Sequence, residues 1–374
     1  MKKTRKLRVL QLLPSLNAGG VERGTLEISR ALVEAGHESI VVSAGGQLTK
    51  ELFAHGAEHI ELAIGKKSLS VIFLIWPLRN ILMMNNVDIV HVRSRLPAWL
   101  LHLTMMFIPT NTRPKIVSTV HGLYSVSKYS EIMTKGDKII AVSNTTEKYI
   151  HDNYPSCPKN KIAVIPRGVS QVEFSVDYKP PEDWKTSFFA QFPEAENKIL
   201  LTLPGRLTRL KGHRKFIKLI DELRSKNINV HGLIVGAEDP RRRGYANEIK
   251  AFIHQRKLSI AISLTGNRND ITDIYSISSI VFSLSEKPES FGRTVAEALN
   301  MSTPVVALKH GGAGELLKEA YPAGLVPLDI GASELAVKVI AILESVPDIN
   351  IKSIPTLDDM TSKTINLYRN VVGS

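Results

Sequence analysis

The sequence of 374 residues contains a single cysteine, Cys157, which excludes a disulfide framework and any zinc site built on cysteine. It also lacks a long apolar run. The most apolar stretch, Leu69 to Met84, is shorter than the roughly 20 residues of a spanning helix and is interrupted by Pro77 and Arg79, so we predict a buried or interfacial helix. The run Val9 to Leu13 is too short for the core of a signal peptide. We therefore expect a cytoplasmic protein.

Acidic residues are fewer than basic residues, and the excess of basic residues is larger in the first half of the chain. The chain has 48 Lys and Arg against 36 Asp and Glu, a formal net charge of +12. Residues 1–175 hold 22 basic and 13 acidic residues, whereas the remainder holds 26 and 23. A basic half is typical of proteins that meet nucleic acid, an anionic membrane or a phosphorylated substrate. Aromatic residues are not interleaved with a basic stripe, and no nucleic-acid-binding motif occurs, so we expect no nucleic acid partner.

Strand-like runs alternate with helical patterns along the whole chain, which is typical of parallel sheets built from βαβ units. The segment from Ser175 to Asn197 breaks this rhythm, and we interpret it as an irregular linker. We predict an α/β protein of two Rossmann-like, doubly wound domains facing across a cleft: residues 1–175, and residues 176–356. Residues 357–374 read as a final helix. The predicted strands are 7–13, 40–43, 59–63, 88–93, 115–120, 138–142, 161–165, 199–203, 230–235, 259–264, 280–283 and 305–308.

Two glycines, Gly19 and Gly20, stand between the first predicted strand and a helix. Glycines in such a turn let backbone N–H groups approach a phosphate at the helix N-terminus. The third glycine of the dinucleotide fingerprint is missing, and no acidic residue ends the second strand, which argues against a nicotinamide dehydrogenase. A tight turn without a ligand explains the pair equally well.

The second predicted domain opens with a basic loop directly after a strand. Arg206 and Lys211 are five residues apart in the run Leu203 to His213. Both side chains can converge on one diphosphate, because Arg offers a bidentate fork and Lys a point charge. The alternative is a solvated basic turn.

Two glutamates further along the chain could act together with this basic loop. Glu289 and Glu297 are eight residues apart, with Phe291-Gly292 between them at an expected helix N-terminus. Eight residues on a helix span about 12 Å, the distance from a sugar to the ribose of its nucleotide carrier. One carboxylate can then accept hydrogen bonds from sugar hydroxyls and the other from ribose hydroxyls, while the amides between them face phosphates. Two unrelated solvated glutamates are the alternative.

Together these motifs resemble the family-4 group of retaining glycosyltransferases, which have the GT-B fold. The resemblance covers nearly the whole chain. The matching segments are residues 19–22 (Gly-Gly-Val-Glu), 117–122 (Val-Ser-Thr-Val-His-Gly), 140–144 (Ile-Ala-Val-Ser-Asn), 164–169 (Val-Ile-Pro-Arg-Gly-Val), 205–212 (Gly-Arg-Leu-Thr-Arg-Leu-Lys-Gly) and the Glu-x7-Glu run 289–297. Arg167 stands where the family usually has Asn, which leaves the role of this position open.

The resemblance assigns roles to individual residues. It implies that Arg206 and Lys211 neutralise the donor diphosphate and that Glu289 holds the transferred sugar, with His121 beside it. Catalytic roles are thus implied for Glu289, His121, Arg206 and Lys211. The remaining donor-binding positions that it implies are Gly19, Gly20, Gly236, Arg268 in the loop 266–270, Phe291, Gly292 and Glu297.

The same resemblance implies the reaction. The donor would be a UDP- or GDP-sugar, and closure of the two domains would exclude water. The final helix, residues 357–374, would cross back to the first domain. No Asp-x-Asp pair occurs, so we expect no metal and no other cofactor. We expect a glycolipid or oligosaccharide acceptor and attachment to the inner face of an anionic membrane. The run Val90 to Trp99 looks most like transferases of the lipopolysaccharide core. A nucleotide-sugar epimerase or a phosphorylase of the same fold is the alternative.

The paired glutamates generate a first prediction. Glu289→Gln should leave the fold intact and strongly lower kcat, because a carboxylate that accepts from sugar hydroxyls is lost. Glu297→Gln should mainly raise KM for the donor. Steady-state kinetics with a nucleotide-sugar donor measure both effects, and wild-type kinetics in both variants would show the donor-site assignment to be wrong.

Overall fold

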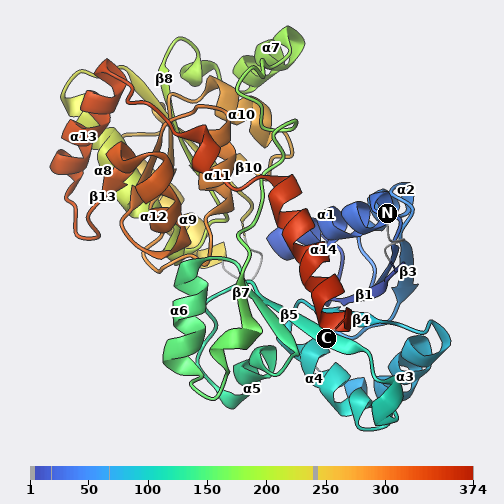
Figure 1. Ribbon diagram of the computed structural model, residues 1–374. Helices are drawn as coiled ribbons and strands as arrows, with labels where there is room; N and C mark the ends of the chain where they lie inside the picture. Colours follow the sequence, from blue (N-terminus) through green and yellow to red (C-terminus); the bar gives the residue numbers. More distant parts are fainter. Residues whose placement is uncertain (1–4, 18, 67, 239–242, 374) are drawn as a thin grey trace. The chain divides into compact units, whose positions relative to one another are not determined.

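The computed structural model describes residues 5–17, 19–66, 68–238 and 243–373, which divide into two compact units (Figure 1). The first unit comprises the chain up to Gly168 together with the segment from Leu357 onward, and the second comprises Val169–Thr356. The predicted boundary, after residue 175, lies seven residues beyond this division. The final helix, α14 (Leu357–Gly373), belongs to the first unit.

The first unit is built on a seven-stranded parallel sheet with the strand order β3-β2-β1-β4-β5-β6-β7. The order reverses direction at β1, as in doubly wound sheets. Each predicted strand of this half forms, with ends shifted by up to two residues. The strands are β1 (Arg8–Leu12), β2 (Glu38–Ser43), β3 (Glu58–Glu61), β4 (Ile89–Val92), β5 (Lys115–Val120), β6 (Lys138–Ala141) and β7 (Ile162–Val164).

The second unit is built on a six-stranded parallel sheet with the order β10-β9-β8-β11-β12-β13. The sequence predicts five of these strands; the two-residue edge strand β13 is too short to leave a pattern. The expected fold of two doubly wound α/β domains is confirmed. The strands are β8 (Ile199–Pro204), β9 (Val230–Val235), β10 (Ile262–Gly266), β11 (Ile280–Ser283), β12 (Val305–Leu308) and β13 (Leu325–Val326).

Helices connect the strands in both units, as the right-handed βαβ connection requires. In the first unit they are α1 (Gly20–Glu34), α2 (Thr49–Ala54), α3 (Ile75–Met84), α4 (Arg95–Met105), α5 (Lys128–Glu131) and α6 (Asn144–Asn153), with a 3₁₀ turn, η1 (Leu69–Leu74), before α3. In the second unit they are α7 (Glu182–Gln191), α8 (His213–Ser225), α9 (Arg243–Gln255), α10 (Ile271–Ile277), α11 (Arg293–Asn300), α12 (Gly311–Ala320) and α13 (Ala332–Glu344). Among the helices of the described residues, none is both long and apolar enough to cross a bilayer.

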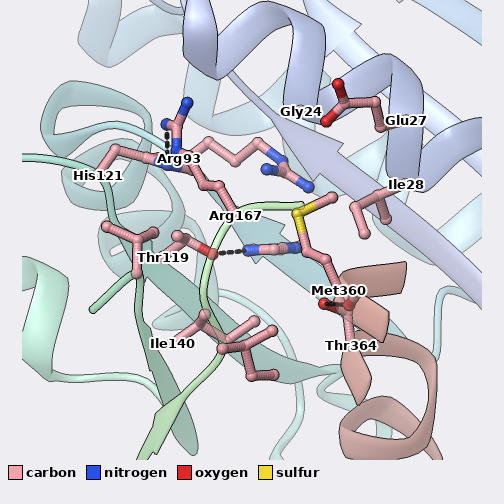
Figure 2. Close-up of a pocket in the computed structure, with 13 residues that line it drawn as sticks. Gly24, Glu27, Ile28, Arg93, Thr119, His121, Ile140, Arg167, Met360 and Thr364 are labelled. Atoms are coloured by element: carbon pink, nitrogen blue, oxygen red, sulfur yellow. Dashed lines mark hydrogen bonds between the residues drawn. The ribbon is translucent and has the colours of Figure 1, made fainter. Parts of the chain in front are cut away.

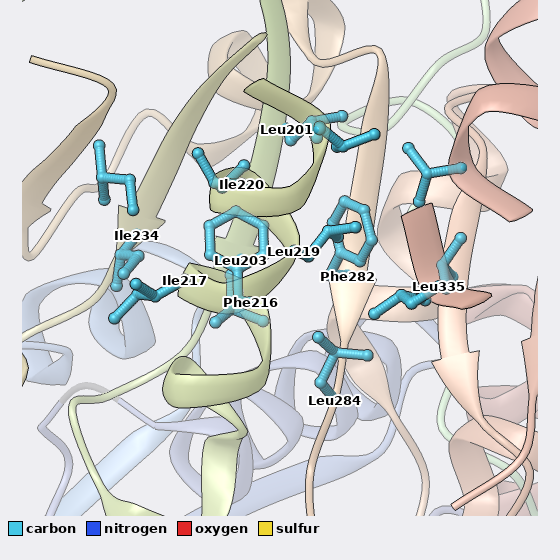
Figure 3. Close-up of a cluster of buried hydrophobic side chains, with 14 of the residues drawn as sticks. Leu201, Leu203, Phe216, Ile217, Leu219, Ile220, Ile234, Phe282, Leu284 and Leu335 are labelled. Atoms are coloured by element: carbon cyan, nitrogen blue, oxygen red, sulfur yellow. The ribbon is translucent and has the colours of Figure 1, made fainter. Parts of the chain in front are cut away.

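Apolar side chains from α8 and the central strands form the core of the second unit (Figure 3). Phe216 on α8 and Phe282 on β11 are fully buried, and their ring centroids lie 5.3 Å apart. Each buried side chain of this size contributes about 1.5–3 kcal/mol relative to an exposed one. This packing fixes the position of α8 on the sheet, and with it the basic loop that precedes α8.

The segment that we expected to be an irregular linker contains a helix, so that expectation is wrong. Residues 182–191 form α7, which follows Pro181. Trp184, Phe188 and Phe192 recur at a spacing of four residues, and Phe188 packs against Leu200 and neighbours in a small apolar cluster. The helical period is present in the sequence, but only three aromatic residues carry it, which makes it a weak signal.

Helix α14 is tied to the first sheet by apolar contacts and by one buried hydrogen bond. Met360, Ile365 and Tyr368 join a cluster that includes residues of β1 and α1. The Tyr368 hydroxyl lies 2.6 Å from Nδ1 of His91 on β4, and Nε2 of His91 lies 2.6 Å from the Thr119 hydroxyl on β5. Burial, and secondarily the charge of Arg93, holds the pKa of His91 well below its ordinary value, so the ring is neutral.

This bond generates a second prediction. Tyr368→Phe leaves Nδ1 of His91 without its partner, and an unsatisfied buried polar group costs about 1–3 kcal/mol. The free energy of unfolding in urea should fall by that amount. Tyr129→Phe, at a ring that is 43% exposed, is the matched control and should change the free energy by less than about 0.5 kcal/mol. Equal stability of both variants would contradict the assigned role of the bond.

Candidate active site

The loops that follow β8, β9, β10, β11 and β12 all leave the second sheet at its carboxyl edge, because its strands are parallel. These loops carry the site residues that the sequence predicts for this half, except Glu297, which lies within α11. The strand order places β8 between β9 and β11, so the basic loop after β8 adjoins the loop that carries Glu289.

The loops after β8 and β11 enclose a hollow of about 290 Å³. The structure brings Arg206 and Lys211 together there, as predicted. Lys287 adds a third cation that the sequence analysis missed, although it stands only two residues before Glu289. The lining residues are Arg206, Thr208, Leu210, Lys211, Ser285, Lys287, Pro288 and Glu289. Three cations against one carboxylate make the hollow suitable for an anion such as a diphosphate.

Glu289 is the carboxylate of this hollow, and Lys211 is its ion partner. Lys211 Nζ donates to Glu289 Oε1 at 2.6 Å, and the Ser285 hydroxyl donates to the same oxygen. Burial alone would raise the pKa of the Glu289 carboxyl, but Lys211, Ser285 and His310 outweigh it and lower this pKa. Glu289 is therefore ionised at neutral pH. The ammonium group of Lys211 has three donors and uses one of them here.

Gly212 allows the two loops to approach. It adopts a left-handed conformation with φ 73°, and a Cβ atom at this position would lie 2.1 Å from the Leu284 carbonyl oxygen. A side chain would therefore force the β8 and β11 loops apart. The close approach of these two loops therefore explains why a glycine follows Lys211.

Glu289 and Glu297 do not lie on one helix. The expectation that a helix sets a distance of about 12 Å between them is therefore wrong. Helix α11 begins only at Arg293, and Gly292 caps it with φ 99°. Glu289 lies in the preceding loop. Its backbone carbonyl accepts a hydrogen bond from the Gly312 N–H at 2.7 Å. A Cβ on Gly292 would lie 2.9 Å from Ala313, which fixes this turn against α12.

Glu297 is 7% exposed and lies within α11. Arg293 Nε donates to its Oε1 at 2.8 Å, and the Tyr275 hydroxyl lies 3.5 Å from Oε2. Its predicted ribose-binding role stays a prediction. Phe291 is buried at 5% exposure and Gly292 is the helix cap, so both keep the helix-start position expected from the sequence.

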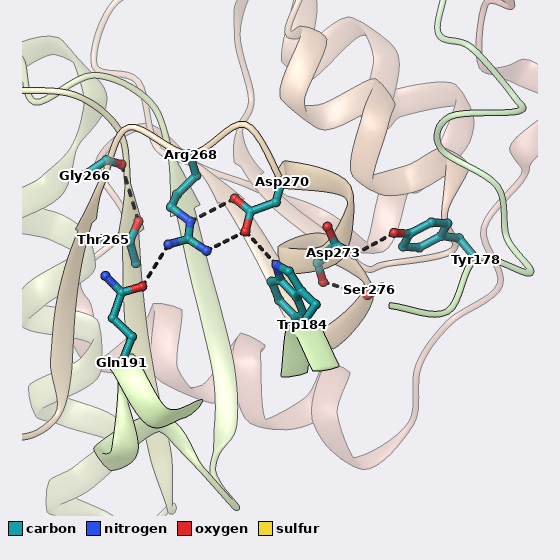
Figure 4. A network of polar contacts seen from close by, with 9 residues as sticks. All are labelled: Tyr178, Trp184, Gln191, Thr265, Gly266, Arg268, Asp270, Asp273 and Ser276. Atoms are coloured by element: carbon teal, nitrogen blue, oxygen red, sulfur yellow. Dashed lines mark hydrogen bonds and ion pairs between the residues drawn. The ribbon is translucent and has the colours of Figure 1, made fainter. Parts of the chain in front are cut away.

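Arg268 is held by its own loop and by α7 (Figure 4). Its Nε donates to Asp270 at 2.9 Å, its Nη1 donates to Gln191 at 3.0 Å, and Trp184 Nε1 donates to the same Asp270 at 2.7 Å. Burial would raise the pKa of Asp270, but Arg268 and Trp184 lower it on balance. Arg268 does not line the hollow described above, and its role in a base pocket stays a prediction.

Gly236, at the end of β9, is a point of close approach. A Cβ there would lie 2.1 Å from the Gly205 carbonyl oxygen, so only glycine fits beside the start of the basic loop. This contact brings the loops after β8 and β9 together. The structure leaves the predicted donor-binding role of Gly236 untested.

In the first unit, the predicted residues Gly20 and His121 are linked by Arg167. Helix α1 begins at Gly20, and Gly19 precedes it in an extended conformation. Arg167 Nη1 donates to the Gly20 carbonyl at 2.9 Å, and Arg167 Nη2 lies 2.7 Å from Nδ1 of His121. A Cβ on Gly20 would lie 2.6 Å from Arg167 Nη1, so this glycine makes room for the guanidinium.

Arg167 also determines the tautomer of His121. A guanidinium group can only donate, so Nδ1 accepts and the proton of the neutral ring resides on Nε2. Burial, followed by the charges of Arg167 and Arg93, holds the pKa of His121 well below its ordinary value. The sequence marked position 167 as a departure from the family pattern but gave no partner for it, because that partner lies 46 residues away.

Two groups near the carboxyl edges were not predicted at all. In the second unit, His310 donates to the Ser285 carbonyl at 2.7 Å and is followed by Gly311-Gly312, whose backbone packs against the Glu289 loop. The sequence signal that could have revealed this contact is the glycine pair Gly311-Gly312 after β12. In the first unit, Arg93 directly follows β4 and is buried. Nothing in the sequence distinguishes it from a surface arginine.

The described residues contain no group of three His, Cys, Asp or Glu side chains arranged to hold a metal ion. Metal independence itself stays a prediction.

Similarity to known proteins extends over both units. The model named Glycosyltransferase Family 4 matches residues 18–171, and the model named Glycosyl transferases group 1 matches residues 185–350. A crystal structure of a glycosyltransferase from Rickettsia africae is 32% identical, has a TM-score of 0.86, and covers 98% of this chain and 99% of that chain. Anabaena Alr3699/HepE, solved with UDP and glucose, is 19% identical with a TM-score of 0.79 over 96% of this chain and 99% of that chain.

A curated human relative is more distant. This protein of Homo sapiens is named for a phosphatidylinositol N-acetylglucosaminyltransferase, and it is 25% identical over 81% of this chain. The match spans 62% of the human protein.

The Arg167–His121 pair generates a third prediction. Arg167→Gln removes a positive charge beside the ring, and a like charge disfavours protonation, so the pKa of His121 should rise. NMR titration of the imidazole signals measures this pKa. Lys148→Gln, an exposed change on α6, is the control and should leave it unchanged. An unchanged His121 pKa in Arg167→Gln would show that the pair does not control the ring.

Proposed function

Because the chain belongs to the glycosyltransferases and has their GT-B fold, we propose that it transfers a sugar from a nucleotide-sugar donor to a glycolipid acceptor at a membrane surface. The single observation that carries the proposal is the hollow in the second unit, where Arg206, Lys211 and Lys287 face the ionised carboxylate of Glu289. Cations suit a diphosphate, and an adjacent carboxylate suits sugar hydroxyls.

The donor is a nucleoside diphosphate sugar in this proposal. The cations of the hollow neutralise the diphosphate, Glu289 accepts from hydroxyls of the transferred sugar, and Glu297 accepts from the ribose. Uridine is favoured over guanosine by the similarity to Alr3699/HepE, whose structures contain UDP, glucose and UDP-glucose. That similarity is one of fold, and the base specificity of this chain rests on assay.

The proposed reaction breaks the bond between the anomeric carbon and the diphosphate oxygen and forms a bond from that carbon to an acceptor hydroxyl oxygen. The acceptor proton passes to the departing diphosphate on the same face, so the anomeric configuration is retained. Arg206 and Lys211 stabilise the developing negative charge, as fixed cations do in a water-excluded site, and this removes the need for a metal. Neutral His121 donates from Nε2 to a substrate hydroxyl.

The test is incubation with labelled UDP- and GDP-sugars, each with and without a bacterial glycolipid extract, in excess chelator. We expect label to enter the lipid fraction with one donor and with unchanged anomeric configuration. Label that changes sugar identity without an acceptor would indicate an epimerase, and transfer to inorganic phosphate would indicate a phosphorylase. Activity that requires added magnesium would contradict the metal-independent mechanism.

An exposed apolar patch in the first unit supports the membrane part of the proposal. Large apolar side chains on η1, α3 and the end of α4 are about half exposed or more: Ile72, Phe73, Trp76, Met106 and Phe107. The rings of Trp76 and Phe107 lie 5.2 Å apart, so the two helices present one surface. Apolar patches of this kind mark binding surfaces, and Trp is favoured at membrane interfaces.

The charge of the segment that carries this patch supports an anionic membrane as the partner. Residues 62–130 contain eight basic residues, of which Arg93 is buried, and one acidic residue, Asp88, which pairs with Arg5. Arg79 lies over the Trp76 ring and donates to the Phe107 carbonyl. Each basic residue near an anionic surface contributes about 1 kcal/mol. Three lysines that would contribute to this charge, Lys2, Lys3 and Lys67, lie outside the residues that the structure describes.

The acceptor is proposed to be a cell-envelope glycolipid. The similarity of residues 90–99 to lipopolysaccharide-core transferases supports this class, and the human relative is itself named for phosphatidylinositol. The proposed location is the inner face of the cytoplasmic membrane.

The patch generates a fourth prediction. The wild type should float with liposomes of phosphatidylcholine and 30% phosphatidylglycerol at low salt, and high salt should weaken the binding. The double variant Phe73→Ser, Trp76→Ser should reduce the bound fraction at least tenfold, because interfacial burial of two aromatic rings is lost. Val172→Ser, at a side chain that is 90% exposed in the second unit, is the control. Equal flotation of both variants would contradict the assignment of the patch.

A further inference from the structure

A small cavity lies within the first unit, at the carboxyl edge of its sheet (Figure 2). Its volume is about 30 Å³, enough for a water molecule or a single oxygen atom of a larger group. Side chains from α1, α14 and the strand ends surround it. Its polar members include Arg93, Arg167, His121 and Glu27, and its apolar wall includes Met360.

Arg93 is the exceptional member of this set. It is 4% exposed, and its Nε donates to Oε1 of Gln11 at 2.8 Å. Gln11 is itself fully engaged, because its amide nitrogen bonds to Ser29 and to the Thr25 carbonyl. Nη2 of Arg93 has no hydrogen-bond partner in the part of the chain that the structure describes. Burial lowers the pKa of Arg93 to about 10, so the group is still cationic at neutral pH.

The other groups that face Arg93 leave the cavity positively charged. His91 and His121 are neutral, because burial and the neighbouring arginines hold the pKa of each ring well below its ordinary value. Arg167 adds a second permanent cation. Among the described residues that line the cavity, one is acidic, Glu27. Two cations therefore face one anion. One carboxylate is thus shared by two cations, and a ligand that brings a second negative charge relieves this imbalance.

We propose that the mouth of this cavity binds an oxyanion group of the acceptor, a phosphate or a carboxylate, through Nη2 of Arg93. This inference rests on the proposed transferase function and specifies the chemistry of its acceptor. One oxygen of the group enters the cavity toward Arg93, while Arg167 contributes its charge and Glu27 accepts from a hydroxyl of the same molecule. The donor diphosphate has its own cations in the second unit, so the acceptor is the substrate that this site serves.

Inorganic phosphate is the probe for a direct test that requires no turnover. The full chain with Arg206→Gln and Lys211→Gln, which remove the hollow as a competing phosphate site, is titrated with phosphate at constant ionic strength. The midpoint of thermal unfolding should rise by about 2–4 °C at ten times the dissociation constant. Adding Arg93→Gln should abolish this rise, whereas adding Arg30→Gln, an exposed arginine paired with Glu34 on the same helix as Glu27, should preserve it.

A third variant guards against misfolding of Arg93→Gln. Glu27→Gln keeps Arg93 and removes the opposing carboxylate, so half-saturation should occur at a several-fold lower phosphate concentration. The same rise in Arg93→Gln, no rise in any variant, or weaker binding in Glu27→Gln would each overturn the inference. Acetate in place of phosphate distinguishes a carboxylate site from a phosphate site.

Kinetics then identify which substrate carries the anion. In the transfer assay with the wild type, free phosphate should raise the apparent KM for the acceptor. Arg93→Gln should remove this effect and raise KM for the acceptor at least tenfold, while KM for the donor stays unchanged. A raised KM for the donor with an unchanged KM for the acceptor in Arg93→Gln would overturn the assignment to the acceptor. Failure of the transfer assay itself would refute the proposed function but would leave the thermal titration interpretable.

Discussion

In a parallel sheet every strand runs in the same direction, so the loops that follow the strands all emerge at one edge. Both units of this protein are built on such a sheet, and their chemistry depends on that constraint. It brings Arg206 and Glu289 into neighbouring loops, although 83 residues separate them. It likewise brings Arg93, His121 and Arg167 together from three different strand ends.

Opposite charges are combined differently at the two edges. In the second unit, Lys211 and Glu289 are partly exposed and neutralise each other, while the exposed Arg206 and Lys287 leave a surplus of positive charge for an anion. In the first unit, the cation Arg93 is buried, and its Nε donates to the neutral side-chain amide of Gln11. Partial exposure permits the hollow to exchange its ions for those of a ligand, whereas full burial makes the cavity selective for a group that fits it. The two edges therefore suit different substrates.

The sequence predicted the strands closely, because buried parallel strands form short apolar runs bounded by turn residues. It singled out Arg206, Lys211 and Glu289 because each lies in the loop that follows such a run. It placed Glu289 and Glu297 on one helix wrongly, since a left-handed turn at Gly292 starts α11 only after Glu289. It missed the partners of Arg93 and Arg167, because a contact between residues tens of positions apart leaves no local pattern. The resemblance to a family supplied roles for single residues that spacing alone leaves open.

In the proposed function, the hollow of the second unit binds the diphosphate of a nucleotide sugar without a metal. Calorimetric titration of the full chain with UDP and with GDP, in excess chelator, tests this most directly. We expect saturable binding of one nucleotide at a single site, and an affinity reduced at least tenfold in Arg206→Gln, because a charge-assisted hydrogen bond to phosphate is lost. No heat from either nucleotide, or binding that appears only when magnesium is added, would contradict it.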